Sequence, residues 1–327
     1  MTAQAQILPG SIPARRWKSV LQSYGQELVI LGALVVLFIG VGLYNPRFMS
    51  ATNLTSIFVG NAYIAIAAIG MSMVIISGNI DVSVGSLIGV LGTISGTLAV
   101  KGYPIAICWL APIAIGITVN AVVGTLVAYL RIPSIVVTLG MLSILKGGLI
   151  SSTGGAWITN LPPGFMLAQF RFHGIPSSVY LMVILTTLAA LWMRHTRFGR
   201  TIYAIGGNPE AARVAGIRIE RSVVAVFAIH GFFAGIAAVL FATQLQVIQS
   251  TVPPNLELTV ITASVVGGVS ILGGTGTVIG STLAAILFAT IGSSLVFLNV
   301  SAYWLRAVQG LMILATVLAD MARRRRI

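Results

Sequence analysis

The sequence predicts an all-α integral membrane protein with about ten transmembrane helices. Of its 327 residues, 57% are hydrophobic and 8% are charged, whereas roughly a quarter of the residues in a soluble domain are charged. The mean hydropathy is +1.00. Because a spanning helix needs about 20 apolar residues, the chain has room for roughly that number of spans and short loops.

Ten apolar segments follow one another along the chain. They cover residues 28–41, 54–76, 87–100, 105–130, 133–150, 178–193, 223–243, 256–272, 275–291 and 293–318. The first resembles a signal-peptide core, but no small-residue cleavage site follows, so we expect a retained span. Five spans precede the polar loop 153–176 and five follow it, which predicts two halves in opposite orientations, as in five-helix inverted repeats.

The net charge of +13 is concentrated in clusters beside these segments. The clusters lie before the first span (Arg15, Arg16, Lys18), at Arg131, in the loop 194–221 and in the terminal run 323–326. Basic residues that flank spans mark the cytoplasmic side. We therefore expect a cytoplasmic tail (1–27), a transmembrane domain (28–320), a basic cytoplasmic tail (321–327) and a periplasmic loop 153–176, and no nucleic acid as a partner.

Glycine is frequent in and between the spans. Gly85, Gly89, Gly92 and Gly96 are arranged as two pairs spaced four apart, which permits close approach of helices. The run 266–280 lacks the lysine followed by serine or threonine of a phosphate-binding loop, so helix packing is the preferred interpretation. The single Cys108 and the scattered histidines give no metal-ligand spacing, and no catalytic residue, metal or cofactor is predicted.

The loop Arg194–Arg221 contains the signature of a short helix. Asn208 is placed to cap the first turn, Pro209 suits the first helical position, and Glu210 lies at the positive end of the helix dipole. Ala211, Ala212 and Ala215 continue the helix, and Gly216 ends it in a left-handed turn. An ordinary arginine-rich cytoplasmic loop is the alternative interpretation.

The segment Ser77–Ser86 is a polar interruption between two spans. Asp81 is an ionisable residue close to membrane depth, where such residues face a cavity or a partner. The segment is either a broken helix that lines a translocation pathway or a turn in which Asp81 caps the next helix. The pathway candidates are Asn61, Asn79, Asp81, Ser83 and Gly85.

Five motifs carry a family resemblance that covers nearly the whole chain. They resemble motifs of permease subunits of bacterial ATP-binding-cassette importers, in the ribose-type sugar branch, and are the runs GNIDVSVGS, IPSIVVTLGMLSILKGG, TGGAWITNLP, GGNPEAARVAGI and VVGGVSILGGTGTVIG. Within that branch the pattern looks nearest to permeases for autoinducer-2, rhamnose or ribose.

This resemblance implies the permease fold of these importers and transport by alternating access in the bacterial inner membrane, surrounded by lipid. It also implies two ATP-hydrolysing domains in separate chains, a periplasmic solute-binding protein and a second permease subunit, so the chain itself would not be an enzyme. Resemblance in the run GGNPEAARVAGI implies a role in coupling to the ATPase for Gly207, Asn208, Glu210, Ala211, Ala212, Ala215 and Gly216. Resemblance in the run GNIDVSVGS implies a pathway role for Asn79, Asp81, Ser83 and Gly85.

Two other classes of transporter remain as alternatives. An ion-coupled secondary transporter would use intramembrane carboxylates as ion sites, for which Asp81 and Glu257 are the candidates. A passive channel would have no need of a coupling loop.

Overall fold

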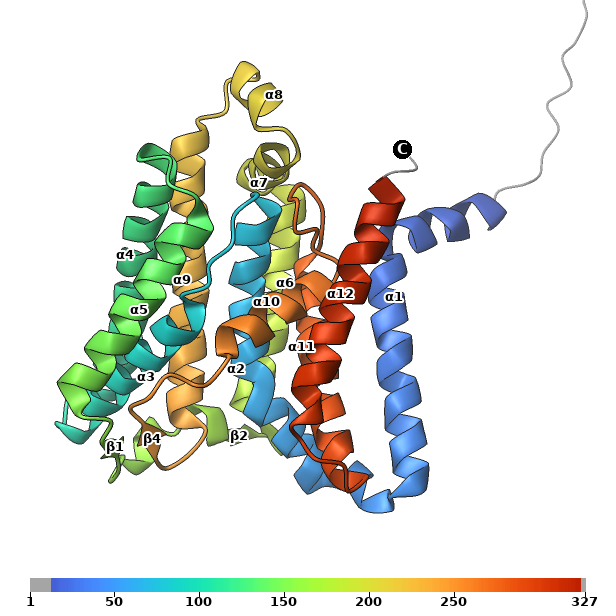
Figure 1. Ribbon diagram of the computed structural model, residues 1–327. Coiled ribbons are helices and arrows are strands. Elements are labelled where there is room, and N and C mark those ends of the chain that lie inside the picture. Colours follow the sequence, from blue (N-terminus) through green and yellow to red (C-terminus); the bar gives the residue numbers. More distant parts are fainter. Residues whose placement is uncertain (1–12, 325–327) are drawn as a thin grey trace, which may run out of the picture.

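The structure, a computed structural model, describes residues 13–324 (Figure 1). The predicted tail residues 1–12 and 325–327 lie outside this range. The helices are α1 (Pro13–Tyr44), α2 (Ala51–Ile76), α3 (Val84–Val100), α4 (Ile105–Tyr129), α5 (Ser134–Thr153), α6 (Ser177–His195), α7 (Arg197–Gly207), α8 (Pro209–Val214), α9 (Ile219–Thr243), α10 (Leu256–Val266), α11 (Val278–Phe297) and α12 (Trp304–Arg324). The all-α prediction is confirmed.

Eight of the described helices are long and apolar enough to cross a membrane, and α3 and α10 are shorter apolar helices. Together they account for the predicted spans. The two short helices each follow a polar break in the chain, 77–83 before α3 and 244–255 before α10. Both spans are therefore partial, and their amino termini lie within the fold.

The last four spans of each half form an inverted repeat. Helix α2 runs toward the end of the molecule that carries α8, and α9 runs away from it (Figure 1). The packing of the first set (α2, α3, α4, α5) is reproduced in the second (α9, α10, α11, α12): α4 packs on α9 as α11 packs on α2, and α3 packs on α4, α5 and α9 as α10 packs on α11, α12 and α2. This is the architecture of inverted-repeat transporters.

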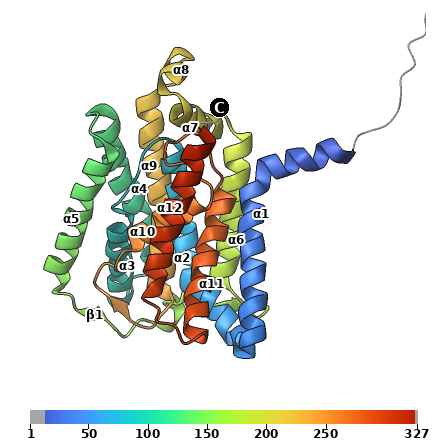
Figure 2. The same ribbon diagram turned by 45° about the vertical axis from the view of Figure 1, so that its right-hand side comes forward.

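The first helix of each half does not follow the repeat. Helix α1 packs on α11, whereas α6 packs on α2 and α11. In Figure 2, α1 lies at the edge of the molecule, next to α11. The repeat observed thus spans four helices in each half rather than the predicted five.

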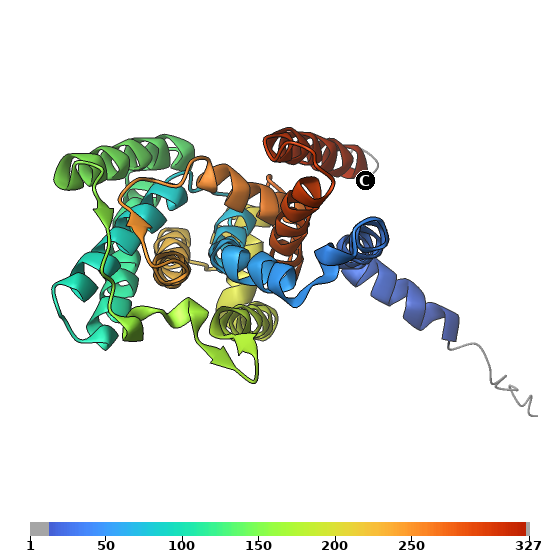
Figure 3. The same cartoon turned by 90° about the horizontal axis from the view of Figure 1, so that it is seen from below.

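The core lies between α2 and α9, which occupy the centre of the view along the helices (Figure 3). In their most apolar stretches, 78% of α2 and 67% of α9 is buried, against 11% of α5 and none of α12. Helices α5 and α12 hold matching positions in the two repeats and leave one face of the chain open to lipid or to another subunit.

The predicted close approach at the glycines of α3 is confirmed. A Cβ at Gly89 would lie 3.3 Å from the Cα of Val252, and one at Gly92 would lie 3.2 Å from the ring of Phe241. A Cβ at Gly96 would collide with the side chain of Ile248. Helix α3 therefore rests directly on the end of α9 and on the break that follows it.

The expectation that residues 266–280 lie inside packed spans is wrong. Most of this glycine-rich run forms the connection between α10 and α11, and four of its glycines have φ between +76° and +138°. Since L side chains rarely adopt such angles, the glycines are used for turns, although Gly267 and Gly280 do meet backbone to backbone.

The loops divide between two ends of the molecule. Helices α7 and α8, the start of α1 and the end of α12 lie at one end, which we call the α8 end (Figure 1). The opposite, far end carries two short antiparallel pairs, β1 (Trp157–Ile158) with β4 (Ile248–Gln249) and β2 (Arg171–Phe172) with β3 (Ile175–Pro176). The basic clusters within the described range gather at the α8 end.

This arrangement predicts the outcome of labelling from the two sides of the membrane. Single cysteines at the exposed positions Ser152 and Ala215, in a Cys108→Ala background, should react with an impermeant maleimide from opposite sides. The native thiol is buried, so its removal leaves the surface unchanged. Reaction of both cysteines from the same side would contradict the topology.

Candidate functional site

Helix α8 stands at the tip of the α8 end, beyond the rest of the fold (Figure 1). Asn208 caps it, because the side-chain oxygen accepts a hydrogen bond from the Ala211 N–H at 3.0 Å. Pro209 is its first residue. Gly216, with φ +81°, lies just beyond its end, and the Gly216 N–H donates to the Arg213 carbonyl at 3.0 Å. The predicted short capped helix is confirmed.

The exposed surface of α8 is not formed by all of its alanines. Gly207, Asn208, Glu210, Ala211, Ala215 and Gly216 are exposed, but Ala212 is 4% exposed and packs inside the protein. Val214 is 90% exposed. A single exposed apolar residue is common on protein surfaces, so Val214 shows only that the tip of α8 is accessible to a partner, and the sequence analysis missed its exposure.

Helix α7 joins α8 to the membrane part through close backbone contact. A Cβ on Gly206 would collide with the carbonyl oxygen of Ile76, the last residue of α2. The same oxygen accepts a hydrogen bond from the Gly274 N–H at 2.8 Å. A Cβ on Gly273 would lie 3.1 Å from the Cα of Gly78. We call these four residues (Gly78, Gly206, Gly273 and Gly274) the glycine junction.

A second link ties α7 to the connection between α10 and α11. The Tyr203 hydroxyl donates to the Gly276 carbonyl at 2.9 Å. Burial, and then the negative charge of Glu27, raise the pKa of Tyr203 above its usual value, so the hydroxyl keeps its proton. Thr277 donates to the Glu27 carboxylate at 2.5 Å and accepts from the Gly280 N–H at 3.2 Å as the cap of α11. Movement of α7 would thus reach α1, α2 and α11.

The break between α2 and α3 is held by polar contacts to α5 and α9. The Ile80 N–H donates to Ser134 Oγ at 3.2 Å, and Thr138 Oγ1 donates to the Ile80 carbonyl at 3.4 Å. Irregular backbone at membrane depth is tolerated where protein satisfies it in this way.

Asp81 is fully buried in the break. Its Oδ1 accepts from the Ser83 N–H at 2.8 Å and from the Ser83 hydroxyl at 2.6 Å. Ser83 is the N-cap position of α3, which has no side-chain cap, so Asp81 holds the turn before the helix and does not cap the helix itself. Its Oδ2 lies 3.4 Å from Nε2 of His230, a fully buried residue in the middle of α9. Asp81 therefore combines a local bond to Ser83 with a contact across the two repeats. The sequence analysis did not name His230. Its position inside the apolar span of α9 could have identified it as a partner for Asp81, because ionisable residues inside spans are usually paired.

Gly85 lies where the amino termini of α3 and α10 meet. A Cβ on Gly85 would collide with the carboxylate of Glu257, which is in the first turn of α10. The carboxylate therefore lies at the positive ends of two helix dipoles. Broken helices whose amino termini meet in this way build the binding regions of inverted-repeat transporters.

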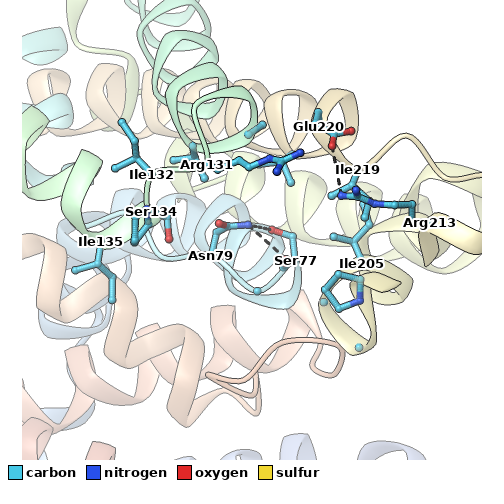
Figure 4. Close-up of a pocket in the computed structure, with 18 of the residues that line it drawn as sticks. Ser77, Asn79, Arg131, Ile132, Ser134, Ile135, Ile205, Arg213, Ile219 and Glu220 are labelled. Atoms are coloured by element: carbon cyan, nitrogen blue, oxygen red, sulfur yellow. Dashed lines mark hydrogen bonds and ion pairs between the residues drawn. The ribbon is translucent and has the colours of Figure 1, made fainter. Parts of the chain in front are cut away.

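A cavity of about 730 Å³ opens at the α8 end beneath α8, and we call it the α8-end cavity (Figure 4). Asn79 lines it and is held by hydrogen bonds to Ser77. Arg131, Ser134 and the ion pair between Arg213 and Glu220, at 3.5 Å, complete its polar wall. The cavity therefore touches the break, the α4–α5 turn and α8 together.

The five pathway candidates separate in the structure. Asn79 faces the α8-end cavity, and Asn61 faces a second cavity at the far end. Asp81, Ser83 and Gly85 are buried and line neither cavity. Across residues 13–324, no three His, Cys, Asp or Glu side chains gather to hold a metal.

An inverted repeat of apolar helices, two broken spans and a projecting polar helix define a multi-pass membrane permease. The family described as "Branched-chain amino acid transport system / permease component" matches residues 53–317, and the chain belongs to it.

Two relatives illustrate the similarity. The chain is 38% identical to the autoinducer 2 import system permease protein LsrC of Salmonella typhi over 296 residues, which cover 90% of this chain and 85% of that protein. It is 35% identical to LsrC of Escherichia coli (strain K12 / DH10B), over 90% of this chain and 86% of that protein. No solved structure matches the chain. The resemblance to autoinducer-2 import permeases is confirmed.

The glycine junction predicts a contrast between two adjacent glycines. Gly206→Ala should lower the apparent melting temperature of the purified protein, because its methyl group would strike the Ile76 carbonyl; overpacking of this kind costs about 1–3 kcal/mol. Gly207→Ala is the matched control, since its nearest foreign atom would be 3.9 Å away. Equal melting temperatures for the two variants would contradict the junction.

The contact between Asp81 and His230 predicts a non-additive pair. Asp81→Ala and His230→Ala should each destabilise the protein, because each leaves a buried polar partner behind. The double variant should be less destabilised than the sum by about 0.5–3 kcal/mol. Thermal unfolding in detergent measures all three. Additive losses would show that the two side chains act independently.

Proposed function

We propose that the chain is the permease subunit of an ATP-binding-cassette importer that carries a sugar or sugar-like solute into the cytoplasm by alternating access. The observation that carries this proposal is the capped helix α8, exposed at one end and joined to both repeats through the glycine junction. The two relatives are named as permease proteins of autoinducer 2 import systems, which supports a small sugar-like solute.

The proposal assigns an orientation and a set of partners. The chain lies in the inner membrane, and its α8 end faces the cytoplasm. This orientation is favoured because the basic clusters lie at that end. Two ATPase domains dock there, a periplasmic solute-binding protein docks at the far end, and a second permease subunit packs beside the open face of α5 and α12. The chain itself hydrolyses no ATP.

The mechanism follows the contacts from α8 inward. When ATP closes the two ATPase domains, α8 moves with the domain bound to it. Because α7 is in backbone contact with Ile76 and Gly274, the movement passes to the end of α2 and to the α10–α11 connection. The spans on either side of the breaks before α3 and α10 then move relative to one another, and access switches between the far end and the α8 end.

A second candidate function rests on the buried contact between Asp81 and His230. Proton-coupled secondary transporters use ionisable groups at membrane depth to carry the proton. Uptake in reconstituted vesicles separates the two functions. An importer requires the ATPase and ignores an imposed proton gradient, whereas a secondary transporter follows the gradient without ATP.

The contact surface on α8 is testable at a single residue. Val214→Glu places a charge on the exposed tip and should weaken docking of the ATPase by about tenfold, equivalent to roughly 1.4 kcal/mol. Solute-stimulated ATP hydrolysis and uptake should fall together. Val214→Ala is the matched control and should retain most of both. Ala212→Glu, by contrast, should disturb the loop itself because Ala212 is buried.

The decisive readout is ATPase rate with and without loaded binding protein, in vesicles that contain the assembled complex. Full stimulation of the Val214→Glu complex would exclude this surface of α8 as the docking contact.

A further inference from the structure

The far end holds a cavity that matches the α8-end cavity through the inverted repeat. The α8-end cavity is bounded by the break after α2, the end of α4, the start of α5 and the start of α9. The far-end cavity, of about 470 Å³, is bounded by the break after α9, the second half of α11, the start of α12 and the first half of α2. These four boundaries correspond between the two repeats, whereas α7, α8 and Leu272, which also line the α8-end cavity, have no counterpart in the far-end cavity.

The far-end cavity presents polar groups that the protein does not use. Gln309 and Arg306 of α12 and Asn255 before α10 line it, and within residues 13–324 their side chains make no hydrogen bond or ion pair. Asn61 donates to the Ile57 carbonyl at 2.9 Å and keeps its own side-chain oxygen as an acceptor. The wall thus offers both donors and acceptors.

Other lining groups give the cavity a fixed shape. Asn53 donates to the Phe48 carbonyl at 2.7 Å and accepts from the Ser293 hydroxyl at 2.8 Å, so this side of the wall is locked. Ile64 and Phe288 supply apolar surface. Small-molecule sites combine mostly apolar walls with a few placed polar groups in volumes of about 300–1,000 Å³.

We propose that the far-end cavity is a binding site for a neutral sugar or sugar-like polyol, the first position the solute occupies in the permease after leaving the binding protein. Amide and guanidinium donors with an amide acceptor suit adjacent hydroxyl groups, and an apolar wall suits the carbon face of a ring. The proposal rests on the proposed function, from which the direction of entry is taken.

The test uses the complete complex in vesicles, with D-ribose, L-rhamnose and autoinducer-2 as radiolabelled probes, each supplied on a binding protein that accepts it. Gln309→Leu and Arg306→Gln should each lower the number of solute molecules transported per ATP hydrolysed by about threefold to tenfold, the effect of one lost hydrogen bond. ATP hydrolysis stimulated by the loaded binding protein should remain unchanged.

Gln246→Leu is the matched control. It makes the same chemical change at the same end, at an exposed residue outside the cavity, and should leave transport per ATP unaltered. If transport per ATP fell in Arg306→Gln but not in Gln309→Leu, Arg306 would act at the membrane surface and the proposed site would be overturned.

A second measurement does not depend on turnover. Gln309→Cys in the Cys108→Ala background should react with an impermeant maleimide from the binding-protein side, and free D-ribose, L-rhamnose or autoinducer-2 should slow the reaction. Unchanged reactivity with every probe, together with unchanged transport per ATP in Gln309→Leu, would refute the site. Loss of ATP-dependent uptake in the wild-type complex would instead refute the proposed function.

Discussion

The contact between Gly206 and the carbonyl oxygen of Ile76 is the constraint on which the rest of the α8 end depends. No side chain fits at Gly206, so the end of α7 lies directly against the end of α2, and Gly274 donates to the same oxygen. Three segments far apart in the sequence thereby share one point. Close-packed groups transmit displacement instead of absorbing it, so a force applied at α8 reaches both repeats.

The inverted repeat explains why the centre of this membrane protein contains broken helices. Two short helices, α3 and α10, enter from opposite ends and meet at their amino termini, where Gly85 leaves room for Glu257. The free N–H groups of both termini favour negative charge at that point. The same symmetry places one cavity at each end of the molecule.

Some of the buried polar groups lie where the two repeats touch. Asp81 binds Ser83 locally and contacts His230 across the interface, and the exposed backbone of the break is satisfied by α5. Unsatisfied groups cost several kcal/mol in an apolar medium, so these contacts fix how the break is seated against α9. Helices α5 and α12 are the least buried of the spans, with 11% and none of their most apolar stretches buried, and they form the open face.

The sequence by itself determined the apolar spans, the capped helix α8, the close approach of α3 and the gathering of basic residues at one end. These follow from composition and from signals within a few residues, such as Asn208 before Pro209 or glycine spaced by four. The tertiary structure alone decided that His230 faces Asp81, that Ala212 is buried while Val214 is exposed, that Gly206 admits no Cβ, and that the repeat covers four helices in each half. Each of these depends on which segments of opposite orientation pack together, and apolar helices in a membrane share one hydropathy pattern whichever neighbour they meet.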